Sequence, residues 1–225
     1  MKACERSRAG RGCALSKGDI DTMPDQQACL AGAAGNEPLA LETARLRLRQ
    51  WRKADFAPFA ALNADPLAMA HFPAPLDRAA SDAMALRCQS LIAGRGWGFW
   101  AVERKPDGVF VGMVGLHEPA WTLPFSPCVE IGWRLAPAYW GQGYAMEAAL
   151  AALRFGFERL ALAEIVSFTA LPNAPSRALM ERLGMVADGT FEHPAVAQDS
   201  PLRLHWLYRL SSERWRGLYG DGGTP

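Results

Sequence analysis

The pattern of apolar and polar positions separates a polar N-terminal stretch from a series of strands and helices. Residues 1–38 mix Arg, Gly, Ala, Ser and Asp without a sustained period, so we expect them to be disordered. Period-two alternation over residues 45–51 then predicts a half-exposed strand. Its arginines are expected to form a solvated face, with ligand contacts as the less favoured interpretation.

Two helices and a hairpin are predicted next. Asp55 is expected to cap a helix that runs to about Asn63, and a second helix is expected over residues 77–92. Residues 98–103 and 109–116 have the composition of strands. The Lys-Pro-Asp-Gly sequence that connects them has strong turn chemistry, so the two strands should pair as a hairpin.

The most informative stretch combines a strand, a glycine turn and a helix. Residues 129–135 form a short apolar strand, which the following Ala-Pro sequence ends. Residues 140–145 read Trp-Gly-Gln-Gly-Tyr-Ala, and helical spacing of apolar positions continues from there to residue 160. Glycines at a helix start leave backbone N–H groups unpaired and unshielded, and such a terminus attracts phosphates.

This turn therefore predicts a backbone-built pyrophosphate site, although the same arrangement also occurs as a plain connection. Two common phosphate-binding motifs do not fit. No Gly-Lys-Ser/Thr follows the glycines, which excludes a Walker loop. A dinucleotide fold needs a third glycine and a ribose-binding acid farther downstream than Glu164.

The C-terminal part continues the alternation of strands and helices. Residues 163–170 are rich in β-branched side chains and predict a strand. Asn173 should open a helix over residues 176–183, which Gly184 ends at the position where glycine is most common.

A closing strand is predicted at residues 202–210, followed by a frayed tail at residues 213–225. The order of elements predicts one mixed α/β domain over residues 39–212. For the N-terminal extension, translation starting at Met23 instead of Met1 is an open alternative.

Composition narrows the location and the partners. The chain has 225 residues, a net charge of +1, and 50% hydrophobic residues, which is ample for a core. The near-neutral charge argues against nucleic acid or an anionic membrane as partner. No apolar run approaches the roughly 20 residues that a membrane span needs. Five cysteines without a Cys-x-x-Cys pair suit a reducing cytoplasm.

Two sequence blocks carry a family resemblance. Residues 130–135, Glu-Ile-Gly-Trp-Arg-Leu, followed by residues 140–146, resemble the acyl-CoA signature of the GNAT acetyltransferases. Asn-Ala-Pro-Ser at residues 173–176, with Leu-Gly-Met from residue 183, is similar to the second block of that family. The resemblance spans about residues 41–210 and is strongest to the RimJ/RimL-like (ribosomal-protein-alanine acetyltransferase-like) branch. Trp140 departs from it, because Gln or Arg is usual there.

The resemblance implies the GNAT acyl-CoA N-acyltransferase fold. This is an α/β (α+β) fold whose mixed central sheet is splayed at the cofactor site and carries helices on both faces. It also implies acetyl-CoA as cosubstrate, bound without a metal. The residues expected to bind it are Trp133, Arg134, Leu135, Trp140, Gly141, Gln142, Gly143, Tyr144, Ala145, Met146, Asn173 and Ser176.

The resemblance further implies catalytic residues. Glu130 is the candidate general base, since the family commonly uses a carboxylate on this strand; a structural ion pair with an arginine is the equal alternative. Ser176 is a candidate donor to the leaving thiolate, or a purely structural first-turn serine. Many members have an acidic tyrosine where this chain has Met180. Possible substitutes outside the motif are Tyr208, His193 and His205.

The acceptor is less specified. The helices after the first strand wall the acceptor site in this family, so His71, Phe72 and Trp100 are candidate substrate contacts. We expect a cytoplasmic N-acetyltransferase, monomeric or homodimeric, that transfers acetyl by direct attack in a ternary complex. The acceptor would be a primary amine of a protein or peptide N-terminus or of a small molecule. Alternatives are a small-molecule (amino acid, polyamine or drug) acetyltransferase and a non-catalytic acyl-CoA-binding sensor.

Overall fold

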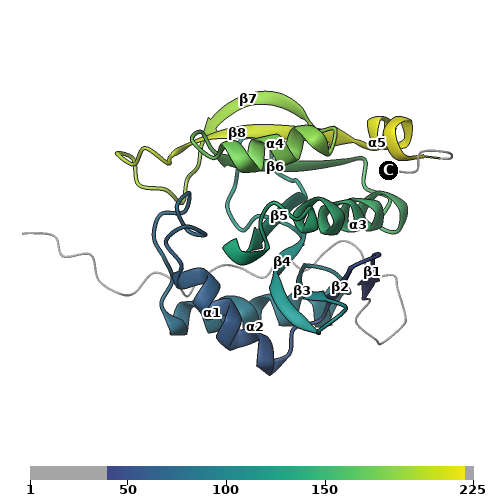
Figure 1. The fold of residues 1–225 in the computed structure, drawn as a ribbon. Coiled ribbons are helices and arrows are strands. Elements are labelled where there is room, and N and C mark those ends of the chain that lie inside the picture. The colour runs from purple at the N-terminus through teal and green to yellow at the C-terminus, as the bar shows by residue number, and fades with distance from the viewer. Residues whose placement is uncertain (1–39, 221–225) are drawn as a thin grey trace, which may run out of the picture. The chain divides into compact units, whose positions relative to one another are not determined.

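An open sheet of eight strands organises the residues that the structure, a computed structural model, describes, namely residues 40–220 (Figure 1). The expected disorder of residues 1–38 lies outside this range. The strand order is β1-β2-β3-β4-β5-β6-β8-β7, and within residues 40–220 only β5 and β6 pair in parallel. The strands are β1 (Leu41–Glu42), β2 (Leu46–Arg49), β3 (Phe99–Arg104), β4 (Val109–His117), β5 (Glu130–Leu135), β6 (Glu164–Ala170), β7 (Val186–Glu192) and β8 (Leu204–Ser211).

Helices cover both faces of this sheet, as expected. Arg134 on β5 bonds Asn63 of α1, whereas its neighbour Leu135 packs in the core beside α3. Successive strand residues point to opposite faces, so α1 and α3 lie on opposite sides. The helices are α1 (Phe56–Ala64), α2 (Arg78–Arg95), α3 (Tyr144–Glu158), α4 (Ala174–Arg182) and α5 (Ser212–Tyr219), with short 3-10 turns at η1 (Lys53–Asp55) and η2 (Pro137–Tyr139).

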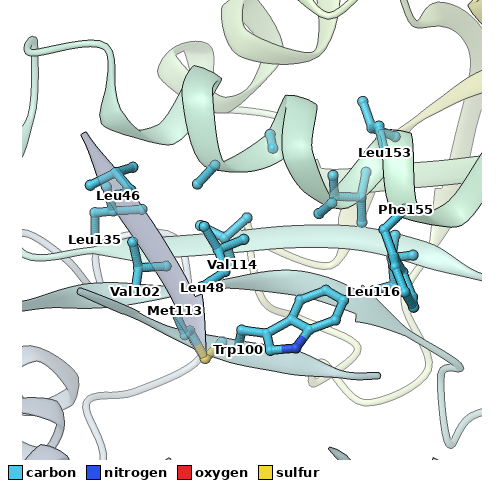
Figure 2. Close-up of a cluster of buried hydrophobic side chains, with 14 of the residues drawn as sticks. Leu46, Leu48, Trp100, Val102, Met113, Val114, Leu116, Leu135, Leu153 and Phe155 are labelled. Carbon is cyan, nitrogen blue, oxygen red and sulfur yellow. The ribbon is translucent and has the colours of Figure 1, made fainter. Parts of the chain in front are cut away.

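The buried core includes residues of α1 and α2 as well as of α3, and Figure 2 shows the part between α3 and the strands β2 to β5. Leu153 and Phe155 of α3 face this layer, and Trp100 of β3 packs edge-on against Phe155 at 5.4 Å between ring centroids. Trp100 and Leu153 are fully buried. Burial of such large apolar side chains contributes about 1.5–3 kcal/mol each, which fixes α3 on the sheet.

The first part of the chain shows two corrections. Arg49 of β2 is buried rather than solvated, because its guanidinium bonds the carboxylates of Asp55 at 2.7 and 2.8 Å and of Glu103 at 2.7 Å. Asp55 stands at the start of α1 without capping it through its side chain. Its carboxylate is instead occupied by Arg49 and by the backbone N–H of Arg52 at 2.7 Å.

The predicted frayed tail is also wrong over residues 213–219, which form most of α5. The hydroxyl of Ser211 caps this helix by accepting a bond from the Arg214 N–H at 3.1 Å. Trp215 is buried and stacks on Phe157 of α3 at 5.3 Å. A single buried tryptophan thus ties the C-terminal helix to the core, which a count of polar residues does not reveal. Residues 221–225 lie outside the described range.

Within residues 40–220, none of the helices combines the length and the apolar character that crossing a bilayer requires.

Candidate active site

The central parallel strands separate just where the resemblance places the acyl-CoA arm. β5 and β6 share a single register pair, Glu130 with Val166. At the next residue the two strands are linked by a side chain, because the Ser167 hydroxyl on β6 donates to the Ile131 carbonyl on β5 at 2.9 Å. Beyond it, residues 132–135 of β5 have no partner on β6 within the described range. Diverging strands leave backbone donors and acceptors free for an extended ligand.

The glycine turn before α3 has the geometry that the sequence predicts. Gly141 and Gly143 adopt left-handed backbone conformations, with φ of 71° and 80°, and Gly143 stands at the N-cap of α3. Among residues 40–220, no acceptor is found for the backbone N–H groups of residues 141–146. This run of free donors, together with the positive end of the helix dipole, suits an anion such as a pyrophosphate.

A network from the first hairpin supports this turn from behind. Glu147 in the first turn of α3 accepts bonds from the Thr43 hydroxyl at 2.6 Å, the Arg45 N–H at 2.8 Å and the Arg45 Nε at 2.6 Å. Arg45 also donates from Nη1 to the Gln142 carbonyl at 2.9 Å. The turn is therefore held by the connection between β1 and β2, and one of the arginines expected on a solvated face supports the candidate phosphate site.

The turn and the diverging strands border a cavity of about 700 Å³. The cavity is large enough for the end of a cofactor arm together with an acceptor. It brings together most of the residues that the sequence singled out. Those that line it are Glu130, Trp133, Arg134, Leu135, Trp140, Gly141, Gly143, Tyr144, Ala145, Met146, Asn173, Ser176, His71 and Phe72.

Two candidates do not line the cavity. Trp100 is fully buried against Phe155 on the α3 side of the sheet, so its assignment as a substrate contact is wrong. Strand alternation explains the error, because its neighbour Phe99 is the residue of β3 that faces the cavity. The Gln142 side chain donates to the Ala138 carbonyl at 2.9 Å. Only the backbone N–H of Gln142 is therefore available to a ligand at the turn.

Glu130 is the one acidic side chain among the described residues that line the cavity. It makes no ion pair and no side-chain hydrogen bond within residues 40–220, so the structural ion pair weighed for it is absent there. Burial raises its pKa from 4.5 to about 8. A carboxyl without a counter-ion and with a raised pKa in a cavity is a typical candidate for proton transfer.

His117 was not singled out by the sequence, yet it is the cross-strand partner of Glu130 in the β4–β5 register. Its ring stacks on Phe99 at 5.3 Å, and its buried Nδ1 has no hydrogen-bond partner within residues 40–220. Burial lowers its pKa to about 4, which makes it neutral at pH 7. The sequence offered no local signal for this pairing, because the long connection over residues 118–129 does not fix the register of β4 and β5.

The opposite wall comes from α4. Asn173 caps this helix by accepting from the Ser176 N–H at 3.3 Å, and its amide donates to the Thr169 hydroxyl at 2.8 Å. The Ser176 hydroxyl accepts from the Trp133 indole at 3.3 Å, across the gap between α4 and β5. Its own proton remains available to a ligand.

The possible substitutes for the missing tyrosine acid lie in different places. Met180, which stands at the tyrosine position, is buried and lines the cavity. Tyr208 does not line it and donates to Glu181 at 2.8 Å. His193 and His205 do line it, and their rings lie 4.9 Å apart. Burial lowers the pKa of both imidazoles, to about 4 for His193, so both are poor acids at neutral pH.

The α1 side of the cavity holds a buried cation. Arg134 donates from Nη1 to Asn63, and its guanidinium lies 4.1 Å above the Phe72 ring. His71 lies beside Phe72 on the same wall, with a buried Nδ1 that has no partner among the described residues. The resemblance assigns Arg134 to the cofactor, and a buried guanidinium on the α1 side of the cavity was not predicted.

Comparison with known proteins agrees with this geometry. Residues 45–186 match the family model described as acetyltransferase (GNAT) domain. The uncharacterised protein YkkB of Bacillus subtilis is 30% identical over 151 residues, which is 67% of this chain and 87% of that protein. The FsC-acetyl coenzyme A-N(2)-transacetylase of Aspergillus fumigatus is 36% identical over 91 residues, 38% of this chain but only 37% of that enzyme.

Solved structures share the fold. The acetyltransferase of Agrobacterium tumefaciens is 28% identical with a TM-score of 0.63, covering 82% of this chain and 98% of its own. The GNAT-family acetyltransferase of Bacillus anthracis has a TM-score of 0.66 at 23% identity, and the match covers 78% of this chain and 99% of that protein. RimJ of Mycobacterium smegmatis, solved with CoA-disulfide, has a TM-score of 0.58 at 20% identity, and the match covers 76% of this chain and 88% of that protein.

Proposed function

Because the chain belongs to the GNAT family of acetyltransferases, we propose that it transfers acetyl from acetyl-CoA to a primary amine with Glu130 as general base. The observation that carries the proposal is the isolated Glu130 carboxyl on the wall of the cavity, beside the diverging strands. The acetyl donor is already activated as a thioester, so alignment and proton removal supply most of the rate.

The residues present fit the donor. Acetyl-CoA brings a pyrophosphate and an extended amide-containing arm. The free N–H groups of residues 141–146 suit the pyrophosphate, and the unpaired backbone of β5 suits the arm. Asn173 and Ser176 offer further polar contacts from α4 on the facing wall. These features support binding at the backbone level, so Trp140 in place of the usual Gln or Arg is compatible with it.

In the proposed reaction, acceptor amine and donor meet in one ternary complex. The ionised Glu130 removes a proton from the ammonium form of the acceptor, directly or through water. The neutral amine then forms the C–N bond at the thioester carbonyl, and the C–S bond breaks. The nitrogen loses its second proton, which ends on the departing sulfur, so that the products are the amide and the CoA thiol. Ser176 is the candidate donor of a hydrogen bond or proton to the departing sulfur, since its hydroxyl only accepts a bond from Trp133.

Thiol release from acetyl-CoA across a panel of amines and N-terminal peptides tests this proposal. We expect Glu130→Gln to bind CoA like the wild type but to turn over about 100-fold or more slowly. Glu158→Gln on the exposed end of α3 is the matched control and should retain full activity. Turnover of Glu130→Gln at the parent rate would exclude Glu130 as the base.

The panel also separates the alternatives. Turnover of peptides that begin with a small residue would support the RimJ/RimL-like assignment, which a RimJ structural neighbour at 20% identity only suggests. Turnover of small amines alone would identify a small-molecule acetyltransferase. Tight CoA binding without turnover of any amine would identify an acyl-CoA sensor and refute the proposed activity.

A further inference from the structure

We propose that Arg134 binds a carboxylate of the acceptor, so that the preferred acceptor is an amine that also carries an acid group. This inference rests on the proposed acetyl transfer and specifies its substrate class. Arg134 comes from β5, the strand that carries Glu130, and its side chain lines the same cavity.

The guanidinium is buried without an anion. Arg134 is only 8% exposed, and it forms no ion pair with any carboxylate in residues 40–220. Its one hydrogen bond goes from Nη1 to the neutral amide oxygen of Asn63. Burial lowers its pKa to about 10, so it still carries its charge at neutral pH. A buried charge without a counter-charge is expensive, which is why a ligand anion is the expected partner.

A second buried arginine on the same face of the sheet shows the contrast. Arg49 of β2 is 5% exposed and is neutralised by Asp55 and Glu103 at 2.7 Å each. At Arg49 two carboxylates therefore compensate the charge of the buried guanidinium. Arg134 has no such carboxylate partner in the described residues. We take this difference as the sign that Arg134 faces a ligand, whereas Arg49 stabilises the fold.

The free part of the guanidinium has the geometry of a carboxylate receptor. Asn63 occupies Nη1, while Nε is buried without a partner and Nη2 has no hydrogen bond within residues 40–220. Nε–H and Nη2–H lie along one edge of the guanidinium plane, and two parallel bonds from such an edge hold a carboxylate bidentately. The free edge thus selects a planar anion rather than a neutral polar group.

The surroundings fix this edge in place. The Phe72 ring lies 4.1 Å below the guanidinium and restrains its plane. Asn63 is itself fully buried and held by donation of its amide to the Ser81 hydroxyl at 2.8 Å. A receptor that is already ordered loses little conformational entropy when the anion binds.

The position of Arg134 relative to Glu130 indicates the length of the acceptor between its amine and its carboxylate. Glu130 and Arg134 are four residues apart on one strand, so they share a face and their Cα atoms are about 13 Å apart. An amine at Glu130 and a carboxylate at Arg134 therefore suit a short extended molecule such as a small peptide. The separation of about 13 Å also keeps the acid group of such an acceptor away from the carboxylate form of Glu130 that acts as base.

Matched acceptors that differ only in charge test the inference. The probes are triglycine and its C-terminal amide, compared by kcat/KM in the wild type, Arg134→Gln and Arg134→Lys. We expect the wild type to prefer the free acid by about tenfold or more, equivalent to about 1.4 kcal/mol. Arg134→Gln should lose this preference through a higher KM for the acid, and Arg134→Lys should recover part of it. Equal use of both probes by the wild type, or an equal loss for both in Arg134→Gln, would overturn the inference.

Binding is measured separately, so that the result does not depend on turnover. Calorimetry of the CoA-saturated protein should show triglycine binding to the wild type and at least about tenfold weaker binding to Arg134→Gln. Arg154→Gln, an exposed charge loss on α3, is the control and should bind like the wild type. If no amine is acetylated, the proposed activity fails, while the preference of the protein for acid over amide in this binding assay still decides the role of Arg134.

Discussion

His117 and Glu130 face each other across the antiparallel pair β4–β5, one at the end of its strand and the other at the start of the next. Both side chains border the cavity, and burial shifts both towards the neutral form. A neutral imidazole cannot stabilise an ionised carboxylate as a counter-ion. The pair therefore keeps Glu130 poised to titrate close to physiological pH instead of locking it in the charged state.

Activity should follow the ionisation of Glu130. With a raised pKa of about 8, Glu130 is mostly protonated at neutral pH. The carboxylate that acts as base becomes the major form only above about pH 8. We expect kcat/KM to rise with pH and to level off above a midpoint near 8, after correction for the ionisation of the acceptor itself. An acceptor amine with a low pKa isolates the enzyme's own midpoint. A flat profile through this range would contradict the assignment.

His117→Ala should move that midpoint. The His117 ring stacks on Phe99 and belongs to the cross-strand neighbour of Glu130, so we expect it to shield the Glu130 carboxyl from water. Removal of the imidazole admits solvent, so the pKa of Glu130 should fall towards its ordinary value of 4.5 and the activity midpoint should shift to lower pH. The affinity for CoA, measured by calorimetry, should stay unchanged. An unshifted midpoint would show that His117 does not control the burial of Glu130.

The same carboxyl should leave a mark on stability. Its pKa is higher in the folded chain than in the unfolded chain, so folding takes up a proton between these two values. The contribution of Glu130 is therefore fully present below about pH 4.5 and is lost as the pH rises through about 8. Between the wild type and Glu130→Gln, we expect the difference in free energy of unfolding to shift in favour of the variant as the pH rises. Urea titrations at several pH values measure this; a constant difference would contradict a raised pKa.

Local patterns in the sequence predicted most of the elements and placed the glycine turn at the start of α3. Gly143 stands at the N-cap of α3 with positive φ, and Gly184 follows α4 in the same conformation. Both follow from the chemistry of a helix end, which a few adjacent residues determine. The position of Glu130 on the cavity wall was predictable for a similar reason. Side chains alternate along a strand, so Glu130 had only two possible faces, and one of them is the cavity.

Features set by distant partners were predicted poorly. Arg49 and Trp100 belong to strands with clear patterns, yet their surroundings come from Asp55, Glu103 and Phe155 on the sheet-facing side of α3. Which face of β3 meets the core depends on where α3 packs, and no local signal encodes that. The C-terminal helix shows the same limit, since the burial of Trp215 depends on packing against Phe157 of α3, which is distant in the sequence.

Gly143→Val tests the phosphate site at the backbone level. The native φ of 80° is disfavoured for residues with a Cβ by about 1–2 kcal/mol, and the added Cβ would lie 3.3 Å from Arg45 Nη2. The turn should therefore shift and weaken CoA binding by about tenfold or more. Gly108→Val is the control, because Gly108 has a φ of 68° and open space around it in the β3–β4 turn. The control should lose stability but bind CoA normally; equal CoA affinity in both variants would refute the role of the turn.

Glu147→Gln removes the support behind that turn. The Glu147 carboxylate accepts two bonds from Arg45 and one from Thr43, and its side chain is only 18% exposed. These hydrogen bonds lower its pKa below the ordinary value of a glutamate, although its burial opposes them. Bonds to charged groups contribute about 1.5–3 kcal/mol, so the variant should lose a free energy of unfolding on the order of 1–2 kcal/mol at neutral pH.

The pH dependence distinguishes this loss from a general packing defect. A carboxylate with a lowered folded pKa stabilises the protein above its unfolded pKa, and this contribution disappears as the pH falls through the folded value. The wild type and Glu147→Gln should therefore converge in stability at acidic pH, whereas Glu158→Gln, an exposed glutamate on the same helix, should match the wild type throughout. Because Arg45 also holds the Gln142 carbonyl, the same variant should weaken CoA binding in calorimetry. A stability loss that persists unchanged into acid would mean that the shape of the side chain, and not its charge, supports the turn.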